Sequence, residues 1–153
     1  MKTVPLKESE YNVKIGKIVE AKDLTELEKY FKIVLEAEES LDHDPGQFVM
    51  VNLPGIGEAP ISVSSSPTKR GYFELVVRNV GKLSSAMHKM GAGDVIGIRG
   101  PFGVGFPTDI LEGNDLLFVA GGLGIVPLRS LINFVIDNRR DFGKVNILLG
   151  CKS

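Results

Sequence analysis

The chain has 153 residues, of which 43% are hydrophobic and only 7% aromatic, and its formal net charge is −1. This nearly neutral charge gives no reason to expect a nucleic acid or an anionic membrane as a partner. The single cysteine, Cys151, excludes an internal disulfide and favours a reducing compartment. The N-terminus is charged and no apolar run approaches the ~18 residues of a membrane span, so we expect a cytoplasmic protein.

The first two-thirds of the chain are predicted to form short strands with turn residues between them. Residues 30–36 alternate cleanly between apolar and polar, the pattern of a strand with one buried face. In the first strand, Val13, Ile15 and Val19 are expected to share a face. The predicted strands cover residues 13–19, 30–36, 47–53, 61–65, 72–80 and 95–99. Strands this closely spaced, with one short helix candidate over 85–90, favour a closed antiparallel barrel.

A serine-rich stretch follows Pro60. It carries four hydroxyl groups within five residues, at Ser62, Ser64, Ser65 and Ser66. In a closed core each hydroxyl would need a partner, whereas on a strand that faces a polar heterocyclic ligand all four could donate and accept hydrogen bonds. The alternative is a solvated edge strand that happens to be rich in serine.

A second polar turn lies at 80–87. Gly81 precedes Ser84, which is a favourable N-cap residue for the short helix that follows. The start of this helix, with Lys82 beside it, is predicted to form a phosphate-sized anion site. The loop over 100–107 is rich in glycine and proline, which indicates only that the backbone turns sharply there.

The pattern changes after Pro107. A continuous apolar run over 116–120 predicts a strand buried on both faces, and a helix over 126–140 and a strand over 145–149 complete a βαβ unit. The helix is expected to bury one apolar face, with Pro127 in its first turn. That face consists of Val126, Leu128, Leu131, Ile132, Val135 and Ile136.

Glycines at 121, 122 and 124 lie between the first strand and the helix of this unit. A strand, a glycine turn and a helix together form an anion site, because unpaired N–H groups and the helix dipole point to whatever lies above the turn. We therefore expect a nucleotide phosphate here. The alternative is an ordinary tight turn.

A single βαβ unit cannot bury its own sheet. One helix covers one face, so Val119, Ile147 and Leu149 are expected to be exposed unless the barrel or a neighbouring molecule covers them. We expect residues 1–110 to form the barrel and residues 111–153 to be the beginning of a longer second domain.

These segments, taken in order, resemble the ferredoxin-reductase type of FAD/NAD(P)-binding oxidoreductases. The resemblance rests on five motifs: Pro45-Gly46-Gln47-Phe48, residues 60–65, Gly81-Lys82-Leu83-Ser84, Gly100-Pro101-Phe102-Gly103 and residues 121–127. Residues 59–62 are most similar to flavin subunits of anaerobic enzymes, namely those of sulfhydrogenase (its gamma subunit), anaerobic sulfite reductase and dihydroorotate dehydrogenase (its electron-transfer subunit). The fold that this implies is mainly β with α/β: an antiparallel Greek-key FAD-binding barrel followed by the first βαβ unit of a Rossmann-like NAD(P)-binding domain.

The resemblance also implies a function. NAD(P)H would reduce FAD, and the flavin would pass electrons to an iron–sulfur, hydrogenase or reductase subunit of a larger complex. Ser62 would hydrogen-bond the flavin, whereas Ala59 stands where the family has a phosphate-binding arginine. The FAD-binding residues would be Pro60, Ile61, Ser62, Val63, Arg78, Gly81, Lys82, Leu83, Ser84 and Ser85, and the NAD(P)-binding residues Gly121, Gly122, Leu123, Gly124, Ile125 and Pro127.

The cofactors carry the redox chemistry, so no catalytic side chain and no metal ligand is expected in this chain. We expect His43 and His88 to be surface residues. The alternative function is a non-catalytic flavin-binding electron-transfer module, or a fragment of one, that docks on larger catalytic subunits.

Overall fold

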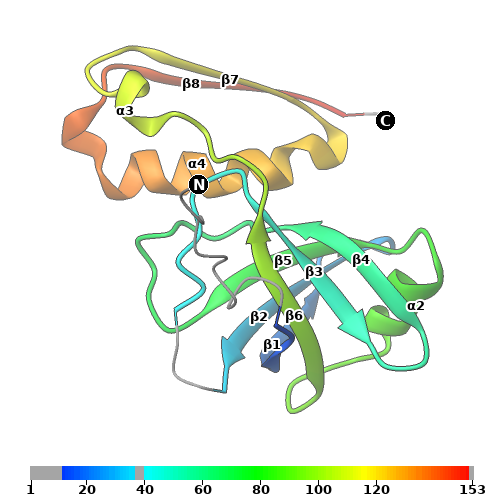
Figure 1. Ribbon diagram of the computed structural model, residues 1–153. Helices are drawn as coiled ribbons and strands as arrows, with labels where there is room; N and C mark the ends of the chain where they lie inside the picture. The colour runs from blue at the N-terminus through cyan, green and yellow to red at the C-terminus, as the bar shows by residue number, and fades with distance from the viewer. Residues whose placement is uncertain (1–11, 37–39, 152–153) are drawn as a thin grey trace, which may run out of the picture.

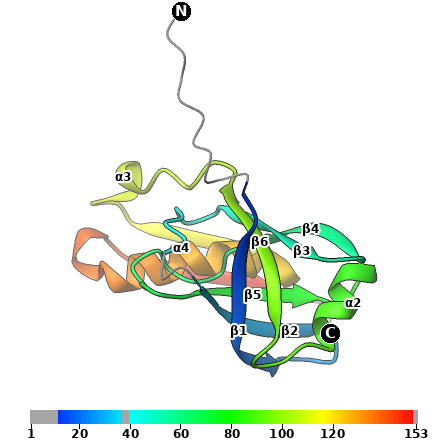
Figure 2. The ribbon, with the colours of Figure 1, turned by 60° about the horizontal axis from the view of Figure 1, so that its bottom comes forward.

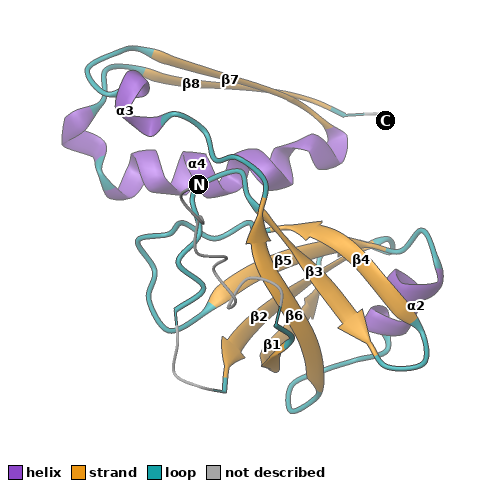
Figure 3. Ribbon diagram, in the orientation of Figure 1, coloured by secondary structure: helices purple, strands orange, loops and turns teal. Residues whose placement is uncertain are grey.

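The structure is a computed structural model and describes residues 12–36 and 40–151. Two parts are visible, a curled sheet and a smaller unit of two strands and one long helix (Figures 1 and 3). The strands are β1 Lys14–Asp23, β2 Glu28–Leu35, β3 Phe48–Leu53, β4 Gly57–Ser62, β5 Phe73–Arg78, β6 Val95–Phe102, β7 Leu116–Gly121 and β8 Val145–Gly150. The α-helices are α2 Lys82–His88, α3 Thr108–Leu111 and α4 Ile125–Asp137, and two 3₁₀ turns cover Gly122–Gly124 and Arg139–Asp141.

Six strands form one antiparallel sheet in the order β4-β3-β6-β1-β2-β5. Its two edges meet just after β4, where Val63 forms an isolated bridge with Leu75 and the Ser64 N–H donates to the Glu74 carbonyl at 2.9 Å. The predicted mainly β fold is therefore confirmed. The predicted closure is not found: among the described residues the sheet curls into an open barrel whose edges touch at this one bridge and share no continuous ladder.

The interior of this barrel is apolar. The predicted alternation of β2 is confirmed, because Phe31, Ile33 and Leu35 are all buried. The apolar face predicted for the first strand is the one that points outward. Ile18 is completely buried, whereas Val13, Ile15 and Val19 are between 43% and 52% exposed.

The inward face of β1 lies one residue out of phase with these three residues, because successive side chains of a strand point to opposite faces. Gly16 pairs with Leu35 and faces the core beside Ile18. A Cβ atom at Gly16 would lie only 2.9 Å from Cγ2 of Ile33, so the interior has room for a glycine and not for a larger residue. The inward positions of β1 therefore do not stand out as an apolar series in the sequence.

The serine-rich strand lies earlier than predicted. It was expected over 61–65, but β4 ends at Ser62 and the following serines have left the ladder. The reason is the bridge at Val63, where the chain changes partner from β3 to the strand on the opposite edge of the sheet.

The second unit consists of the parallel pair β7 and β8 with α4 packed on one face (Figure 1). The predicted burial of β7 on both faces is wrong. Leu116 and Phe118 are buried against α4, whereas Leu117 and Val119 are 61% and 64% exposed. One helix can cover only one face of a two-stranded sheet, which is the physical reason for the difference.

The remaining predictions for this unit are largely confirmed. Val119, Ile147 and Leu149 are exposed, as expected. On the predicted apolar face of α4, Val126 is buried, whereas Ile136, near the C-terminal end of the helix, is 57% exposed. No helix among the described residues is both long and apolar enough to cross a membrane.

Candidate functional site

The serine segment was predicted to face a ligand, and this prediction is wrong for three of its four serines. Ser64, Ser65 and Ser66 are all at most 1% exposed. The Ser64 hydroxyl donates to the Glu74 carbonyl, and the Ser65 hydroxyl accepts from the Glu74 N–H, both at 3.1 Å. The backbone and a neighbouring threonine supply the partners that buried hydroxyl groups require.

Ser62 differs from these three serines. Its side chain is half-buried at the end of β4, and no interaction of its hydroxyl group is found within the described part of the chain. The neighbouring residue Ile61 is also half-buried and packs with Ala59 against the barrel core, whereas Pro60 is exposed. Ser62 is therefore the serine of this segment that can offer a hydrogen bond to a ligand.

The turn before α2 is held together by Ser84. Gly81 is the N-cap residue, so the prediction of Ser84 as N-cap is wrong by one turn. The Ser84 hydroxyl accepts the N–H groups of Val80 and Gly81, at 3.0 and 2.9 Å, and donates to the Gly81 carbonyl. The side chain at the third helical position thus returns to the N-cap backbone, which is one half of a capping box. Its hydroxyl is thus occupied by the turn itself.

The other residues predicted around this turn have different surroundings. Leu83 and Val63 are buried in the barrel core. The Ser85 hydroxyl donates to Asn79 Oδ1 at 2.6 Å, and Arg78 Nε lies 3.5 Å from a carboxylate oxygen of Glu28.

Lys82, at the start of α2, is exposed. Within residues 12–36 and 40–151 its ammonium group has no hydrogen-bond or ion-pair partner. Lys82 is therefore the cation of this turn that is available to an anion.

The glycine turn between β7 and α4 is open. A Cβ atom built at Gly121, Gly122 or Gly124 would meet no atom within 4 Å, so a ligand can approach this backbone closely. Gly122 has φ +49°, a left-handed conformation that favours glycine. Pro127 lies in the first turn of α4, as predicted, and is half-buried together with Leu123 and Ile125.

These regions lie on one side of the molecule. In Figures 1 and 2 the N-terminal end of α4, with the glycine turn, is directed to the side that carries β4 and α2. Ser62 ends β4, Lys82 begins α2 and the glycine turn leads into α4, so the three predicted segments belong to elements on this side.

Arg129 and Ser130 were not predicted to have a role, yet they join α4 to the barrel. Arg129 Nη1 lies 3.0 Å from the Ser64 carbonyl oxygen and 2.5 Å from Glu74 Oε2. The Ser130 hydroxyl, completely buried, donates to the Ser65 carbonyl at 2.6 Å. The only sign in the sequence is a polar pair that interrupts the apolar pattern of the helix.

The prediction that His43 is a surface residue is also wrong, because it is only 5% exposed. Its Nε2 lies 3.0 Å from the Ser65 carbonyl and donates to it. Burial lowers the pKa of His43, since a charged ring is poorly solvated there, and the hydrogen bond with Ser65 opposes this only in part. His88 is half-buried and donates through Nε2 to the Val77 carbonyl.

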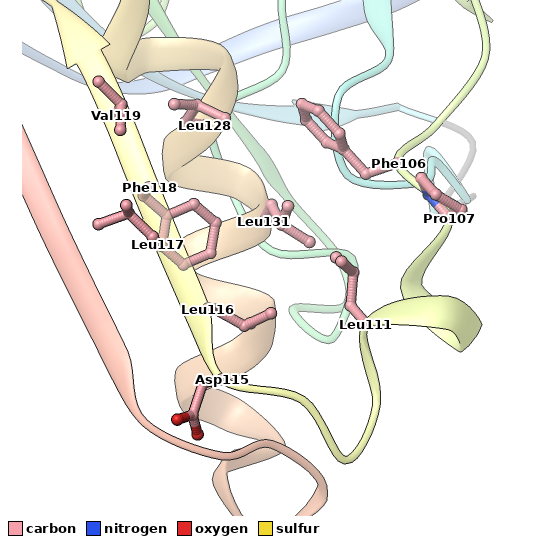
Figure 4. A pocket seen from close by; sticks show the side chains of 10 residues that line it. All are labelled: Phe106, Pro107, Leu111, Asp115, Leu116, Leu117, Phe118, Val119, Leu128 and Leu131. Carbon is pink, nitrogen blue, oxygen red and sulfur yellow. The ribbon is translucent and has the colours of Figure 1, made fainter.

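A pocket lies beside β7, between α4 and the segment that leads from the barrel (Figure 4). It is lined by Phe106, Pro107, Leu111, Asp115, Leu116, Leu117, Phe118, Val119, Leu128 and Leu131. The lining is almost entirely apolar and includes none of the predicted cofactor-binding residues. Among the described residues, no three His, Cys, Asp or Glu side chains are arranged as metal ligands.

Comparison with known proteins confirms the predicted resemblance. A profile of the family described as oxidoreductase FAD-binding domain matches residues 16–105. Sulfhydrogenase 2 subunit gamma of Pyrococcus furiosus is 47% identical over 141 residues, which are 90% of this chain and 48% of that protein. A probable dihydroorotate dehydrogenase B (NAD(+)) electron transfer subunit of Pyrococcus abyssi is 42% identical over 97 residues, 63% of this chain and 36% of that protein. The chain thus spans less than half the length of these relatives.

The same fold is found in solved structures. Phthalate dioxygenase reductase, described as a modular structure for electron transfer from pyridine nucleotides to [2Fe-2S], superposes with a TM-score of 0.79 at 18% identity. The superposition covers 93% of this chain and 44% of that protein. The described barrel and the unit that follows it therefore share the architecture of a ferredoxin-reductase-like protein.

Proposed function

The chain belongs to the family of oxidoreductase FAD-binding domains, and from this membership we propose that it binds FAD and carries electrons between NAD(P)H and an iron–sulfur partner. In this proposal residues 1–110 are the FAD-binding domain and residues 111–153 are the first part of an NAD(P)-binding domain. The observation that carries the proposal is Ser62, a half-buried hydroxyl group without a partner in the described part of the chain, at the end of a strand that the family profile covers.

The donors on this side of the molecule suit the two ends of such a cofactor. A flavin ring presents hydrogen-bonding edges, which the Ser62 hydroxyl can meet beside the apolar surface of Ile61 and Pro60. A pyrophosphate needs positive charge and N–H donors, and Lys82 supplies the charge. Bound FAD supplies the two-electron to one-electron conversion, which no side chain of this chain can perform.

The predicted polar side chains that already have protein partners play a different role in this proposal. Ser84 holds the Gly81 turn in shape, and Ser85 and Arg78 already have protein partners at Asn79 and Glu28. They position the backbone near Lys82, and direct contact of Ser85 or Arg78 with a phosphate would require exchange of these partners. Val63 and Leu83 contribute by packing in the core.

Position 59 departs from the family pattern, in which an arginine precedes the proline. Ala59 provides no charge, so Lys82 is the cation left to face the phosphate in this proposal. A lysine ammonium is a point charge and does not form the two-pronged contact of a guanidinium group. We therefore expect FAD to bind with modest affinity.

The glycine turn is the proposed site of the nicotinamide nucleotide. Gly121, Gly122 and Gly124 leave the backbone accessible, and a helix of 13 residues begins directly after them. Its N-terminal N–H groups and dipole favour an anionic phosphate. Leu123, Ile125 and Pro127 would shape the apolar border of this site.

The partner follows from the relatives. They are named as parts of sulfhydrogenase and dihydroorotate dehydrogenase, and the solved reductase is described with a [2Fe-2S] acceptor. We propose that this chain likewise transfers electrons within a complex, next to an iron–sulfur, hydrogenase or reductase subunit.

Anaerobic titration of the FAD-loaded chain with NADH and with NADPH tests this proposal. Bleaching of the visible flavin absorbance by either nucleotide is expected, and Ser62→Ala is expected to shift the reduction potential of the bound flavin. A chain that retains FAD but is reduced by neither nucleotide would instead support the non-catalytic flavin module. A chain that retains no FAD would contradict both.

A further inference from the structure

Helix α4 contacts the barrel at two places along its length. Near its N-terminal end, Arg129 and Ser130 reach the segment that follows β4. At its C-terminal end, Asp137 accepts hydrogen bonds from Thr68 and from Lys69, the latter at 3.2 Å. The contact at Arg129 and Ser130 lies close along the chain to the glycine turn, whereas the contact at Asp137 lies far from it.

The contact at Arg129 is dense. Its Nη1 atom lies within hydrogen-bonding distance of three acceptors on the barrel: the Ser64 carbonyl at 3.0 Å, the Ser64 hydroxyl at 3.2 Å and Glu74 Oε2 at 2.5 Å. The Glu74 side chain is only 14% exposed, and its second oxygen accepts the Tyr30 hydroxyl at 3.0 Å. Glu74 is thus fixed from two sides, so it provides a rigid acceptor for Arg129.

Ser130 adds a buried bond beside it. Its hydroxyl donates at 2.6 Å to the Ser65 carbonyl, which also accepts His43 Nε2 at 3.0 Å. All three residues are at most 5% exposed, so water does not compete for these bonds. The helix, the serine segment and the loop before β3 therefore meet at one carbonyl oxygen.

Each partner in this contact lies close in sequence to one of the two proposed cofactor sites. Ser64 follows Ser62 by two residues, and Arg129 follows Gly124 by five, which is about 7.5 Å along a helix. A helix is stiff over such a length, so the bonds of Arg129 to Ser64 and Glu74 determine where the glycine turn lies relative to Ser62. Asp137, 13 residues from Gly124, has much less influence on that position.

We propose that Arg129, supported by Ser130, is a positioning residue that sets the nicotinamide site at the glycine turn against the flavin site at Ser62. The proposal rests on the proposed function, because it assigns to the two sites the nucleotide and the flavin. Arg129 acts through Ser64 and Glu74 and touches neither cofactor. Hydride transfer is sensitive to the placement of the reacting groups, with a misplacement of ~1 Å able to cost about a hundredfold in rate.

Replacement of the arginine tests the proposal. In the FAD-loaded chain, Arg129→Ala is expected to lower the limiting rate of flavin reduction by NADH at least about tenfold. The dissociation constants of FAD and NADH are expected to stay within about threefold, because the residues at the two sites are unchanged. Arg129→Lys keeps a charge that can reach Ser64 or Glu74 and is expected to recover part of the rate.

Asp137→Asn is the matched control. It weakens a contact between the same helix and the same barrel, but at the far end of α4. A merely structural role of Arg129 predicts that the two variants slow flavin reduction alike. The positioning role predicts a large loss in Arg129→Ala and a limiting rate within about twofold of the unmodified chain in Asp137→Asn.

Hydrogen exchange gives a readout that needs no cofactor. In the flavin-free chain, Arg129→Ala is expected to speed amide exchange over 121–128, and Asp137→Asn only over the last turn of α4.

The outcomes separate the two proposals. If neither nucleotide reduces the unmodified chain, the proposed function fails. Unchanged exchange over 121–128 in Arg129→Ala would separately overturn the positioning role. Equal rate losses in Arg129→Ala and Asp137→Asn would also overturn it. Should Arg129→Ala not fold, Arg129→Lys and Ser130→Ala decide by the same two measurements.

Discussion

The barrel and the β7–α4–β8 unit bury their apolar residues to very different extents. In the barrel, Ile18, Phe31 and Val49 are completely inaccessible to solvent. In the second unit, Leu117 and Leu148 are 61% and 57% exposed on the face of the sheet that α4 does not cover. A curled sheet encloses its own core, whereas a two-stranded sheet with one helix has a face left over.

The join between the two parts reflects this difference. Their hydrophobic clusters are separate, one inside the barrel and one between α4 and the β7–β8 pair. The bonds described above that connect them are polar, through Arg129, Ser130 and Asp137. Polar bonds are directional, so this join specifies the orientation of α4 on the barrel more than it contributes burial.

The largest effect is expected in the barrel core. Phe31→Ala removes a completely buried ring and is expected to lower the free energy of unfolding by about 3–5 kcal/mol. Urea denaturation followed by circular dichroism measures this loss. A loss below about 1 kcal/mol would show that the barrel interior is not the closely packed core described here.

Position 59 tests whether the barrel alone can complete the proposed flavin site. Ala59→Arg adds a guanidinium group to β4 and is expected to tighten FAD binding by about 1.5–3 kcal/mol, the range for a hydrogen bond to a charged group. Isothermal titration of both proteins with FAD measures the gain. Asn52→Arg, which adds the same guanidinium group to the neighbouring strand β3, serves as a control for the added charge. If Ala59→Arg and the unmodified chain bind FAD with equal affinity, other groups already hold the phosphate.

His43, which shares the Ser65 carbonyl with Ser130, makes the stability of the folded chain depend on pH. Its pKa is lowered in the folded chain, so the unfolded chain binds the proton more readily. Its contribution is therefore complete above the unfolded pKa of 6.5 and is lost as pH falls toward the folded pKa. Between about pH 7.5 and 5 the free energy of unfolding is expected to fall, by at most about 1.4 kcal/mol per pH unit for one proton. His43→Gln, which keeps a donor but does not titrate, should flatten this profile, and an unchanged slope would contradict the assignment.

The smallest effect is expected on the exposed face of β7. Leu117→Lys is expected to change the free energy of unfolding, measured by urea denaturation, by less than about 0.5 kcal/mol, because a charge on this exposed face stays solvated. Leu116→Lys, one residue earlier but 7% exposed, should cost about 3 kcal/mol or more because it buries a charge. Equal costs at the two positions would mean that both faces of β7 are covered in solution.

Local pattern predicted much of the fold. The alternation of β2 and the glycine turn before α4, with Pro127 in the first turn of the helix, each indicate one structure, because neighbouring residues decide them. In β1 the pattern did not indicate which face is buried, since the inward position at Gly16 is crowded by Ile33 from the next strand and leaves no apolar signal of its own. Such crowding is a property of the assembled barrel and cannot be read from one strand.

The candidate site was harder to predict, because residue types do not name their partners. Ser62 and Ser64 look alike in the sequence, yet Ser64 bonds to a backbone group ten residues away and Ser62 to none in the described part of the chain. Arg129 meets Glu74 across 55 residues of sequence, and only the packing of α4 on the barrel brings them together. The resemblance to a family identified the motifs, and the structure separated the free donors from the occupied ones.

Fluorescence titration with FAD tests the proposal that this barrel is a flavin site with Lys82 as its phosphate cation. Purified chain added to micromolar FAD is predicted to quench the flavin emission in a saturable way. Lys82→Ala is predicted to weaken binding about tenfold, as for loss of one charged hydrogen bond, and Lys89→Ala, at the other end of α2, to leave it unchanged. Absence of any saturable quenching by the unmodified chain would contradict the claim.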